Sequence, residues 1–133
     1  MHADSIILTV PARGEYARTV RMTAAELGSR LGMSYDEVED VRMAAEEAFV
    51  YACQCAAEAA EVTFRFAVGD DVIRISVGPL PGCCTDAGSA ASEGYAEFIL
   101  RSVCDEFSVE HSAGSCMLTL GCRMAAPAGA PGA

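Results

Sequence analysis

The amino-acid sequence predicts a two-layer α+β sandwich, in which helices cover one face of a mixed, mostly antiparallel sheet. Two pairs of short, alternating apolar segments lie on either side of turn residues, around 69–71 and 111–114, and predict β-hairpins. Two long segments with helical periodicity precede the first hairpin. The resulting order is β-α-α-β-β-loop-α-β-β. Because the strands pair mostly as hairpins, the helices can cover only one face of the sheet.

The first three elements are indicated by periodicity and by residues that end helices. Residues 5–10 (SIILTV) are short, apolar and β-branched, and they predict a strand. From residue 15 to 31, apolar residues recur at helical spacing, and Gly32 follows where a left-handed C-cap belongs. Ser34 and Glu37 form a capping-box pattern that opens a second helix, which we expect to run to about Ala57.

The second half of the chain contains the two hairpins and one more helix. We expect strands at 61–68 and 72–77, a loop at 78–92, a helix at 93–104, and strands at 107–110 and 115–122. Residues 1–124 then form a single domain. The tail at 125–133 has nothing to pack against, and we expect it to be disordered.

Composition narrows the class of partner. The formal net charge of −10 over 133 residues repels nucleic-acid backbones and anionic membranes, which favours a protein partner. The alternative is that the charge only keeps the domain soluble. No apolar run approaches the ~20 residues that span a bilayer. The first residues show no basic region and no cleavage site of a signal peptide, so we expect a cytoplasmic protein.

The seven cysteines do not predict a disulfide framework, because such frameworks use an even number. We interpret them as reduced thiols that act mostly as small buried hydrophobic residues. A metal site at Cys53 and Cys55 is disfavoured, because side chains two positions apart on a helix point in different directions. Cys83 and Cys84 are adjacent and also unsuited to a metal, so we expect none. A redox role for one of that pair stays open.

The chain resembles a known family along most of its length. The segments VPARGEYARTVRMTAAELGSRLGMSYDEVEDVRMAAEEA (10–48), the hairpin over 61–77, and SEGYAEFILRSVCDEFSVEHSAGSCMLTL (92–120) are similar to the bacterial anti-sigma factors that double as serine kinases. These belong to the histidine-kinase-like ATPase (GHKL) superfamily. The resemblance implies a protein that binds a sigma factor, phosphorylates a serine of an antagonist protein with ATP and Mg²⁺, and often forms a homodimer.

The first family motif is a Glu followed four residues later by Asn, on the second helix. The resemblance gives the Glu the role of general base and gives the Asn oxygen to Mg²⁺. Glu47 keeps its position, but Tyr51 replaces the Asn. A neutral phenol is a poor ligand for Mg²⁺, which prefers hard oxygen ligands in a tight octahedron. A lone helix glutamate can also be an ordinary solvated residue, so Glu47 alone does not establish catalysis.

The other two motifs also depart from the family pattern. In the adenine-binding Asp-x-Gly, Pro79 and Pro81 replace both residues, and proline offers neither a side-chain acceptor nor a backbone N–H. In the phosphate-binding Gly-rich turn, Gly94 remains while Tyr95 and Glu97 replace glycines. A Glu97 charge ~4 Å from a triphosphate would cost about 4 kcal/mol at an effective dielectric of ~20. We therefore expect no cofactor.

Three functional hypotheses follow. The first is a binding module that holds a sigma factor or an antagonist without phosphorylating it, through a helix whose Arg18 matches the family's partner-contacting arginine. Arg18 could equally be a solvated surface residue. The second is an active serine kinase with a divergent site for ATP and Mg²⁺, in which Glu47 acts. The third is an altered pocket, lined by Tyr51, Tyr95 and 79–81, for another ligand.

Overall fold

The computed structural model describes residues 4–56, 60–81 and 90–125, with side chains from Glu97 onward in the last of these ranges. The elements are β1 (Asp4–Pro11), a 3₁₀ turn η1 (Gly14–Tyr16), α1 (Ala17–Leu31), α2 (Tyr35–Cys55), β2 (Glu61–Val68), β3 (Val72–Pro81), α3 (Ala90–Val103), β4 (Glu106–Ser112) and β5 (Ser115–Arg123). Across these residues, no helix combines the length and hydrophobicity needed to cross a membrane.

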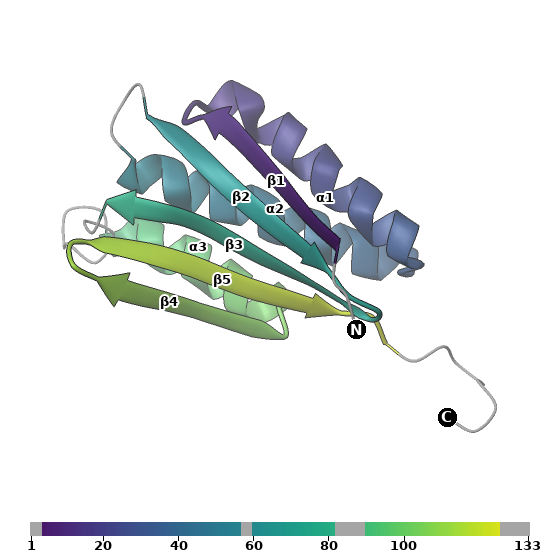
Figure 1. The fold of residues 1–133 in the computed structure, drawn as a ribbon. Coiled ribbons are helices and arrows are strands. Elements are labelled where there is room, and N and C mark those ends of the chain that lie inside the picture. The colour runs from purple at the N-terminus through teal and green to yellow at the C-terminus, as the bar shows by residue number, and fades with distance from the viewer. Residues whose placement is uncertain (1–3, 57–59, 82–89, 126–133) are drawn as a thin grey trace.

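The five strands form one sheet in the order β1-β2-β3-β5-β4, with the helices on one face (Figure 1). The predicted two-layer α+β architecture is confirmed. The sheet differs from the prediction in one respect, since every pairing between the described strands is antiparallel rather than mixed. The reason lies in the last hairpin. Its second strand, β5, inserts between β3 and β4, and so separates the two strands that the α3 connection would otherwise have placed in parallel.

The core lies between the sheet and α2. Phe64 and Phe66 of β2 point toward the helices and are fully buried, and their rings stack with centroids 5.9 Å apart. Phe49 of α2 meets Phe64 with ring centroids 6.2 Å apart. The rest of the buried face of α2 is mostly alanine, at 44, 45, 48 and 52. Small side chains let the helix approach the sheet closely. In so dense an interior, adding or removing even one methylene group changes stability.

Both predicted helix-end signals are confirmed. Gly32 has a φ of 98° at the end of α1, a left-handed conformation that glycine adopts without strain. The Ser34 hydroxyl accepts a hydrogen bond from the Glu37 backbone N–H at 3.2 Å, and the Glu37 carboxylate accepts one from the Ser34 N–H at 2.8 Å. Together these residues set the sharp reversal between α1 and α2.

The predicted loop at 78–92 is wrong at both ends. A bulge between Val77 and Leu80 lets β3 continue to Pro81, where it still pairs with β5, and α3 begins at Ala90. Prolines at a strand end misled the prediction, because a bulge tolerates a residue that cannot donate a ladder hydrogen bond. What remains of the loop, 82–89, lies outside the described residues.

The end of the chain differs from the prediction in two smaller ways. The turn of the last hairpin is confined to Ala113 and Gly114, because β4 continues to Ser112. Ala125 was expected to begin a disordered tail, but its N–H donates to the Glu37 carboxylate at 2.6 Å. Residues 126–133 lie outside the described residues.

Candidate functional site

The first family motif lies on the C-terminal half of α2. Glu47 and Tyr51 are four residues apart, so they share one helix face. Glu47 is half-buried, and burial, with a smaller contribution from neighbouring Glu46, raises the pKa of its carboxyl above the usual range. Tyr51 is only 4% exposed and belongs to the hydrophobic core. Its position therefore combines a proton acceptor of increased basicity with an aromatic ring where the family has a magnesium ligand.

The second motif position lies in the last residues of β3. Leu80 points into the core and is 2% exposed, whereas Pro79 and Pro81 are exposed on either side of it. Leu80 and Pro81 pair with Cys116 and Ser115 of β5, so this backbone already has a partner strand. Within this stretch, no carboxylate is present that could accept a hydrogen bond from an adenine amino group.

The third motif position lies within α3. The helix begins at Ala90, so Gly94 is an interior residue rather than the entrance that the family motif requires. The side chain of Tyr95 lies outside the described part of the structure. Glu97 forms an ion pair with Arg101, with 2.8 Å between nitrogen and oxygen. Arg101 therefore offsets part of the repulsion that the Glu97 carboxylate would exert on an anion.

The three motif positions come from elements that pack against one another, because α2 contacts both β3 and α3. In Figure 1 the C-terminal end of α2 and the arrowhead of β3 lie at the same end of the molecule. The three positions that hold the nucleotide in the family therefore lie on neighbouring elements in this chain as well. Its described residues do not fit ATP and Mg²⁺ by the family's chemistry, since a phenol and two prolines stand where an amide, a carboxylate and a glycine are required.

In the arginine-rich segment 13–30, one arginine makes no ion pair with a described residue. Arg13, Arg21 and Arg30 pair with Glu15, Glu46 and Glu26 respectively. Arg18 is exposed and makes no ion pair with any residue in the described ranges. This leaves Arg18, of the four, with its charge available to a partner.

Sequence reasoning missed an apolar feature beside Arg18. Met22 lies one turn further along α1 and is 57% exposed, and Met43 and Val50 of the neighbouring α2 are 46% and 37% exposed. The Arg21–Glu46 ion pair joins the two helices in this region. The available signal was the helical phase of Met22, which places an apolar side chain outside the buried stripe of α1.

The cysteines require one correction. Cys55, near the buried end of α2, is disulfide-bonded, so the interpretation of all the cysteines as reduced thiols is wrong. The odd number of cysteines argued against a framework of several disulfides, but it does not exclude one disulfide. Cys53, Cys104 and Cys122 are free. Cys83 and Cys84 lie outside the described residues, and within the described ones no group of three or more metal-binding side chains occurs.

Comparisons with known proteins agree with this fold. A family model described as histidine kinase-like ATPase domain matches residues 10–121. The serine-protein kinase RsbW of Bacillus pumilus is 30% identical over 131 residues, covering 84% of this chain and 81% of the relative. RsbW of Bacillus subtilis is 39% identical over 79 residues, and that match spans about half of the relative, 49%. The crystal structure of the RsbU and RsbW domains of a Mycobacterium tuberculosis protein has a TM-score of 0.65 at 23% identity, covering 94% of this chain and 34% of that one.

Proposed function

Because the chain belongs to the histidine kinase-like ATPase domain family, we propose that it is an anti-sigma-like regulator that binds its partner without ATP and without phosphorylating it. The partner would be a sigma factor or an antagonist protein of the same switching system. The observation that supports this most is the burial of Tyr51, which is 4% exposed in the core where the family places its magnesium ligand. A side chain that binds Mg²⁺ must face an accessible, hydrated site, whereas Tyr51 forms part of the packed interior.

A second line of support comes from the end of β3. Its residues continue the sheet by pairing with β5, and both positions that would recognise adenine are prolines. Restoring the family's chemistry would require a side-chain acceptor and a close backbone approach at the same place. Neither Pro79 nor Pro81 provides them.

The surface proposed for the partner is the exposed side of α1 and α2. It combines the charge of Arg18, which has no ion-pair partner among the described residues, with the exposed apolar side chain of Met22. Exposed apolar residues beside an arginine are typical of protein interfaces, where Arg and Met are enriched. Because the chain has a net charge of −10, an acidic segment of a partner would be repelled by most of the surface and attracted to Arg18. The homodimer implied by the family is a further expectation, which light scattering would measure.

The nucleotide part of the proposal is tested by calorimetric titration with ATP and Mg²⁺, and then with ADP. We expect no heat of binding at millimolar nucleotide. Binding in the micromolar range would overturn this part, because it would mean that the altered motifs have been compensated. The RsbW protein of a relative, titrated in parallel, controls for the assay.

The partner part is tested separately by binding to the sigma factors and antagonist proteins of the source organism. Arg18→Ala should weaken the complex at least tenfold, which corresponds to about 1.4 kcal/mol. Arg30→Ala is the matched control, because Arg30 is also exposed on α1 but pairs with Glu26 at 2.9 Å. Equal effects of the two substitutions would contradict the assignment of this surface.

The second candidate is an active serine kinase. One specific observation favours it. Burial raises the pKa of Glu47, as suits a residue that accepts a proton from an attacking hydroxyl near neutral pH. Its relatives are also named serine-protein kinases. This candidate requires phosphate transfer from ATP to a partner serine that disappears in Glu47→Gln, and transfer that survives the substitution would leave Glu47 without this role.

A further inference from the structure

Strand β1 forms one edge of the sheet, and none of the described elements pairs with its outer side (Figure 1). Proteins protect such an edge with charged side chains, proline or a bulge, because its unpaired backbone groups can accept another strand. None of these devices occurs within 5–10 (SIILTV), and the register with β2 is continuous over all eight residues of β1. This edge of the sheet is therefore unprotected along most of its length.

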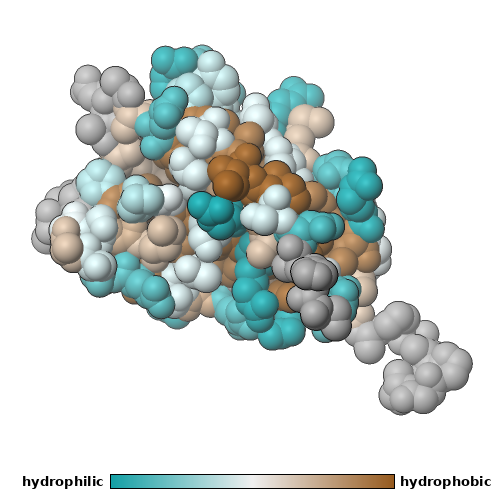
Figure 2. Space-filling model, viewed as in Figure 1, coloured by the Kyte–Doolittle hydropathy of each residue, from teal (hydrophilic) through white to brown (hydrophobic). Residues whose placement is uncertain are grey.

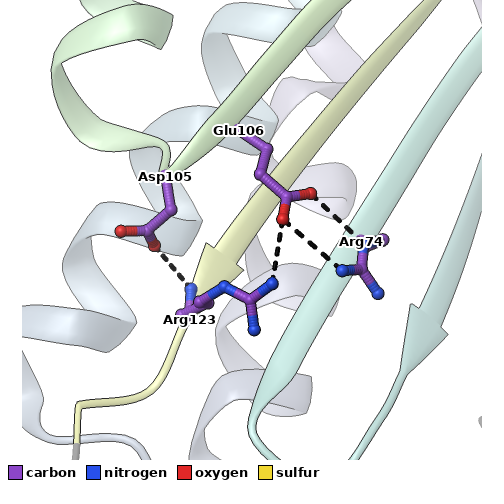
Figure 3. Close-up of polar contacts among 4 residues, drawn as sticks. All are labelled: Arg74, Asp105, Glu106 and Arg123. Carbon is purple, nitrogen blue, oxygen red and sulfur yellow. Dashed lines mark hydrogen bonds and ion pairs between the residues drawn. The ribbon is translucent and has the colours of Figure 1, made fainter.

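The opposite edge of the sheet, β4, is protected by charge. Glu110 is exposed on this strand. The Glu106 carboxylate accepts hydrogen bonds from Arg123 and Arg74, at 3.0 and 3.3 Å for the shortest contacts, as Figure 3 shows. Asp105, just before the strand, accepts from the Arg123 backbone N–H at 2.6 Å. Charges of this kind make β4 a poor template for a further strand, so the two edges differ in what they can bind.

Both faces of β1 carry aliphatic side chains that are incompletely covered. Ile7 lies on the sheet face opposite the helices and is 56% exposed. Ile6 and Leu8 lie on the helix side, where they pack against the core but are only half-buried. In Figure 2, which shows the face opposite the helices, apolar surface gathers over β1 and β2. A strand paired with β1 would therefore bury apolar side chains on both faces of the sheet.

The free backbone groups of β1 belong to alternate residues. The Ala12 N–H donates to the Ala60 carbonyl at 2.9 Å, in register with the pairs that β1 forms with β2. Residues that bond to a given neighbour recur at every second position of an antiparallel strand. The even-numbered residues of β1 therefore bond to β2. The N–H and C=O groups of Ser5, Ile7 and Thr9 point the other way, toward the free edge.

We propose that β1 pairs with β1 of a second copy of this chain, antiparallel about a two-fold axis at Ile7, so that two five-stranded sheets join into one. In this register, Ile7 meets Ile7 of the second copy, and Ser5 meets Thr9 in both directions. Every outward-facing N–H and C=O group of these three residues then has a partner. The pairing is independent of the function proposed above, because β1 contains none of the residues assigned to nucleotide or partner binding.

Neighbouring registers satisfy fewer backbone groups. A shift in one direction places Ser5 opposite Pro11, which has no N–H and whose carbonyl already accepts from the Arg13 N–H at 2.8 Å. A shift in the other direction moves Thr9 past Asp4, the first residue of β1. The register centred on Ile7 is therefore the one that uses all of the free edge within the described strand.

The side chains of β1 are self-complementary in this register. Read from Ser5 to Thr9 in either direction, they run hydroxyl, aliphatic, isoleucine, aliphatic, hydroxyl. A two-fold interface requires such a pattern, because each residue meets the symmetry-related position of the second copy. Ile7 packs against Ile7 on the open face, and Ile6 packs against Leu8 on the helix side. A second copy thus covers the aliphatic side chains that a single copy leaves exposed.

Charge favours this register but opposes association at long range. Asp4 is the only charged residue of β1, and it meets Val10 of the second copy. The two Asp4 carboxylates are then six residues, ~20 Å, apart along the strands. The net charge of −10 on each copy still repels the other copy. Because salt screens that repulsion, the pairing should become stronger as the ionic strength rises.

The first experiment measures the mass of the full chain by light scattering over a range of protein concentrations. We expect twice the mass of one chain. In Ile7→Lys the dissociation constant should rise at least tenfold, because two ammonium groups would meet at the axis. Ser108→Lys is the matched control, since Ser108 is exposed in the same row across the sheet as Ile7, but at the opposite edge. Its dissociation constant should be unchanged.

The second experiment locates the axis with a short bis-maleimide that reaches about two strand spacings, ~10 Å. Ile7→Cys should be cross-linked to its second copy, because the two sulfurs lie about one strand spacing, ~5 Å, apart. Arg65→Cys is the matched control, since Arg65 is the neighbour of Ile7 on β2 and the two copies lie about three spacings, ~14 Å, apart. The unaltered chain gives the background from the native cysteines.

The same reagent tests the register. A mixture of Ser5→Cys and Thr9→Cys should be cross-linked more than either variant alone, because each residue meets the other and lies four residues, ~14 Å, from its own copy. The proposal is overturned by a chain that is monomeric at every concentration, by equal effects of Ile7→Lys and Ser108→Lys, or by cross-linking of Ser5→Cys with itself. Arg18→Ala should leave the mass unchanged, which separates this test from that of the partner surface.

Discussion

The two ends of helix α2 differ in what they contact. At its N-terminal end, the helix is polar, with a capping box at Ser34 and Glu37 and a cavity of about 280 Å³ beside Asp40. At its C-terminal end, the helix is packed, with Tyr51 at 4% and Cys55 at 6% exposure. The family places its nucleotide at the packed end. The difference teaches that the cavity beside Asp40 lies at the end of α2 that the family does not use for nucleotide, whereas Tyr51 fills the end that it does use.

The same substitution at the two ends should give the largest contrast. Tyr51→Asn removes a buried aromatic ring and introduces an amide into the core, so we expect a loss of about 3–5 kcal/mol in the free energy of unfolding. Tyr35→Asn, at the first position of α2, alters a side chain that is 77% exposed, and should change stability by less than about 0.5 kcal/mol. Urea denaturation measures both, and equal losses would show that the packed end is no more constrained than the polar one.

Glycine substitutions should act with opposite signs at the two ends. At Gly78, in the strand beside the packed end, φ is 135° and an added Cβ would lie 3.0 Å from the Cys116 carbonyl oxygen, so Gly78→Ala should cost about 2 kcal/mol or more.

At Gly28, which faces the start of α2, an added Cβ would make ordinary contacts at 3.4 Å with Met33 and Val38. Gly28→Ala should therefore be neutral or stabilise α1 by up to about 1 kcal/mol. Thermal unfolding tests both, and a destabilised Gly28→Ala protein would show that the polar end has no room to spare.

The capping box should account for an intermediate effect at the polar end. Ser34→Ala removes the acceptor for the Glu37 N–H and should cost about 1 kcal/mol. Ser34→Thr keeps a hydroxyl and is the matched control. If urea denaturation shows no difference between the two variants, the N-terminus of α2 is held by tertiary packing and not by its cap.

The smallest predicted effect is a pH dependence of opposite sign at the two ends. Hydrogen bonds from the N–H groups of Ala125 and Ser34 lower the pKa of Glu37 below its ordinary 4.5, so Glu37 stabilises the fold above that value and loses this contribution as pH falls through its folded pKa. Burial raises the pKa of Glu47, so its contribution is fully present below about pH 4.5 and is lost as pH rises through its higher folded pKa.

Two glutamine substitutions test these opposite contributions to stability. Glu37→Gln should lower the melting temperature at pH 7, and Glu47→Gln should leave it unchanged or raise it, with both differences shrinking near pH 3. Both shifts should be smaller than that of Ser34→Ala, because the two carboxylates are partly solvated. The same sign for both variants at pH 7 would contradict the contrast between the ends.

Most of the fold could be predicted because its signals are local. The capping box at Ser34, the C-cap at Gly32 and the alternation of Val62, Phe64 and Phe66 each depend on a few neighbouring residues, and each is confirmed. The predicted end of β3 was wrong because Leu80 and Pro81 pair with Cys116 and Ser115. This long-range pairing outweighs the local tendency of two prolines to end a strand.

The candidate site could be predicted only as a set of positions. The four-residue spacing placed Glu47 and Tyr51 on one helix face, but the burial of Tyr51 depends on how α2 packs against the sheet. The Glu97–Arg101 pair was open to inference, since the residues are four apart on a helix. The cavity beside Asp40 was not, because α2, α3 and β5, which supply its walls, are far apart in the sequence.

The position of β5 has a consequence for how the protein is made. This strand follows β4 in the sequence, yet it lies inside the sheet between β3 and β4. A chain emerging from the ribosome must therefore hold β3 and β4 without their common neighbour until β5 has been made. Unpaired strand edges favour aggregation, so a chain that stops before Ser115 should be insoluble, and folding should depend on rapid insertion of β5.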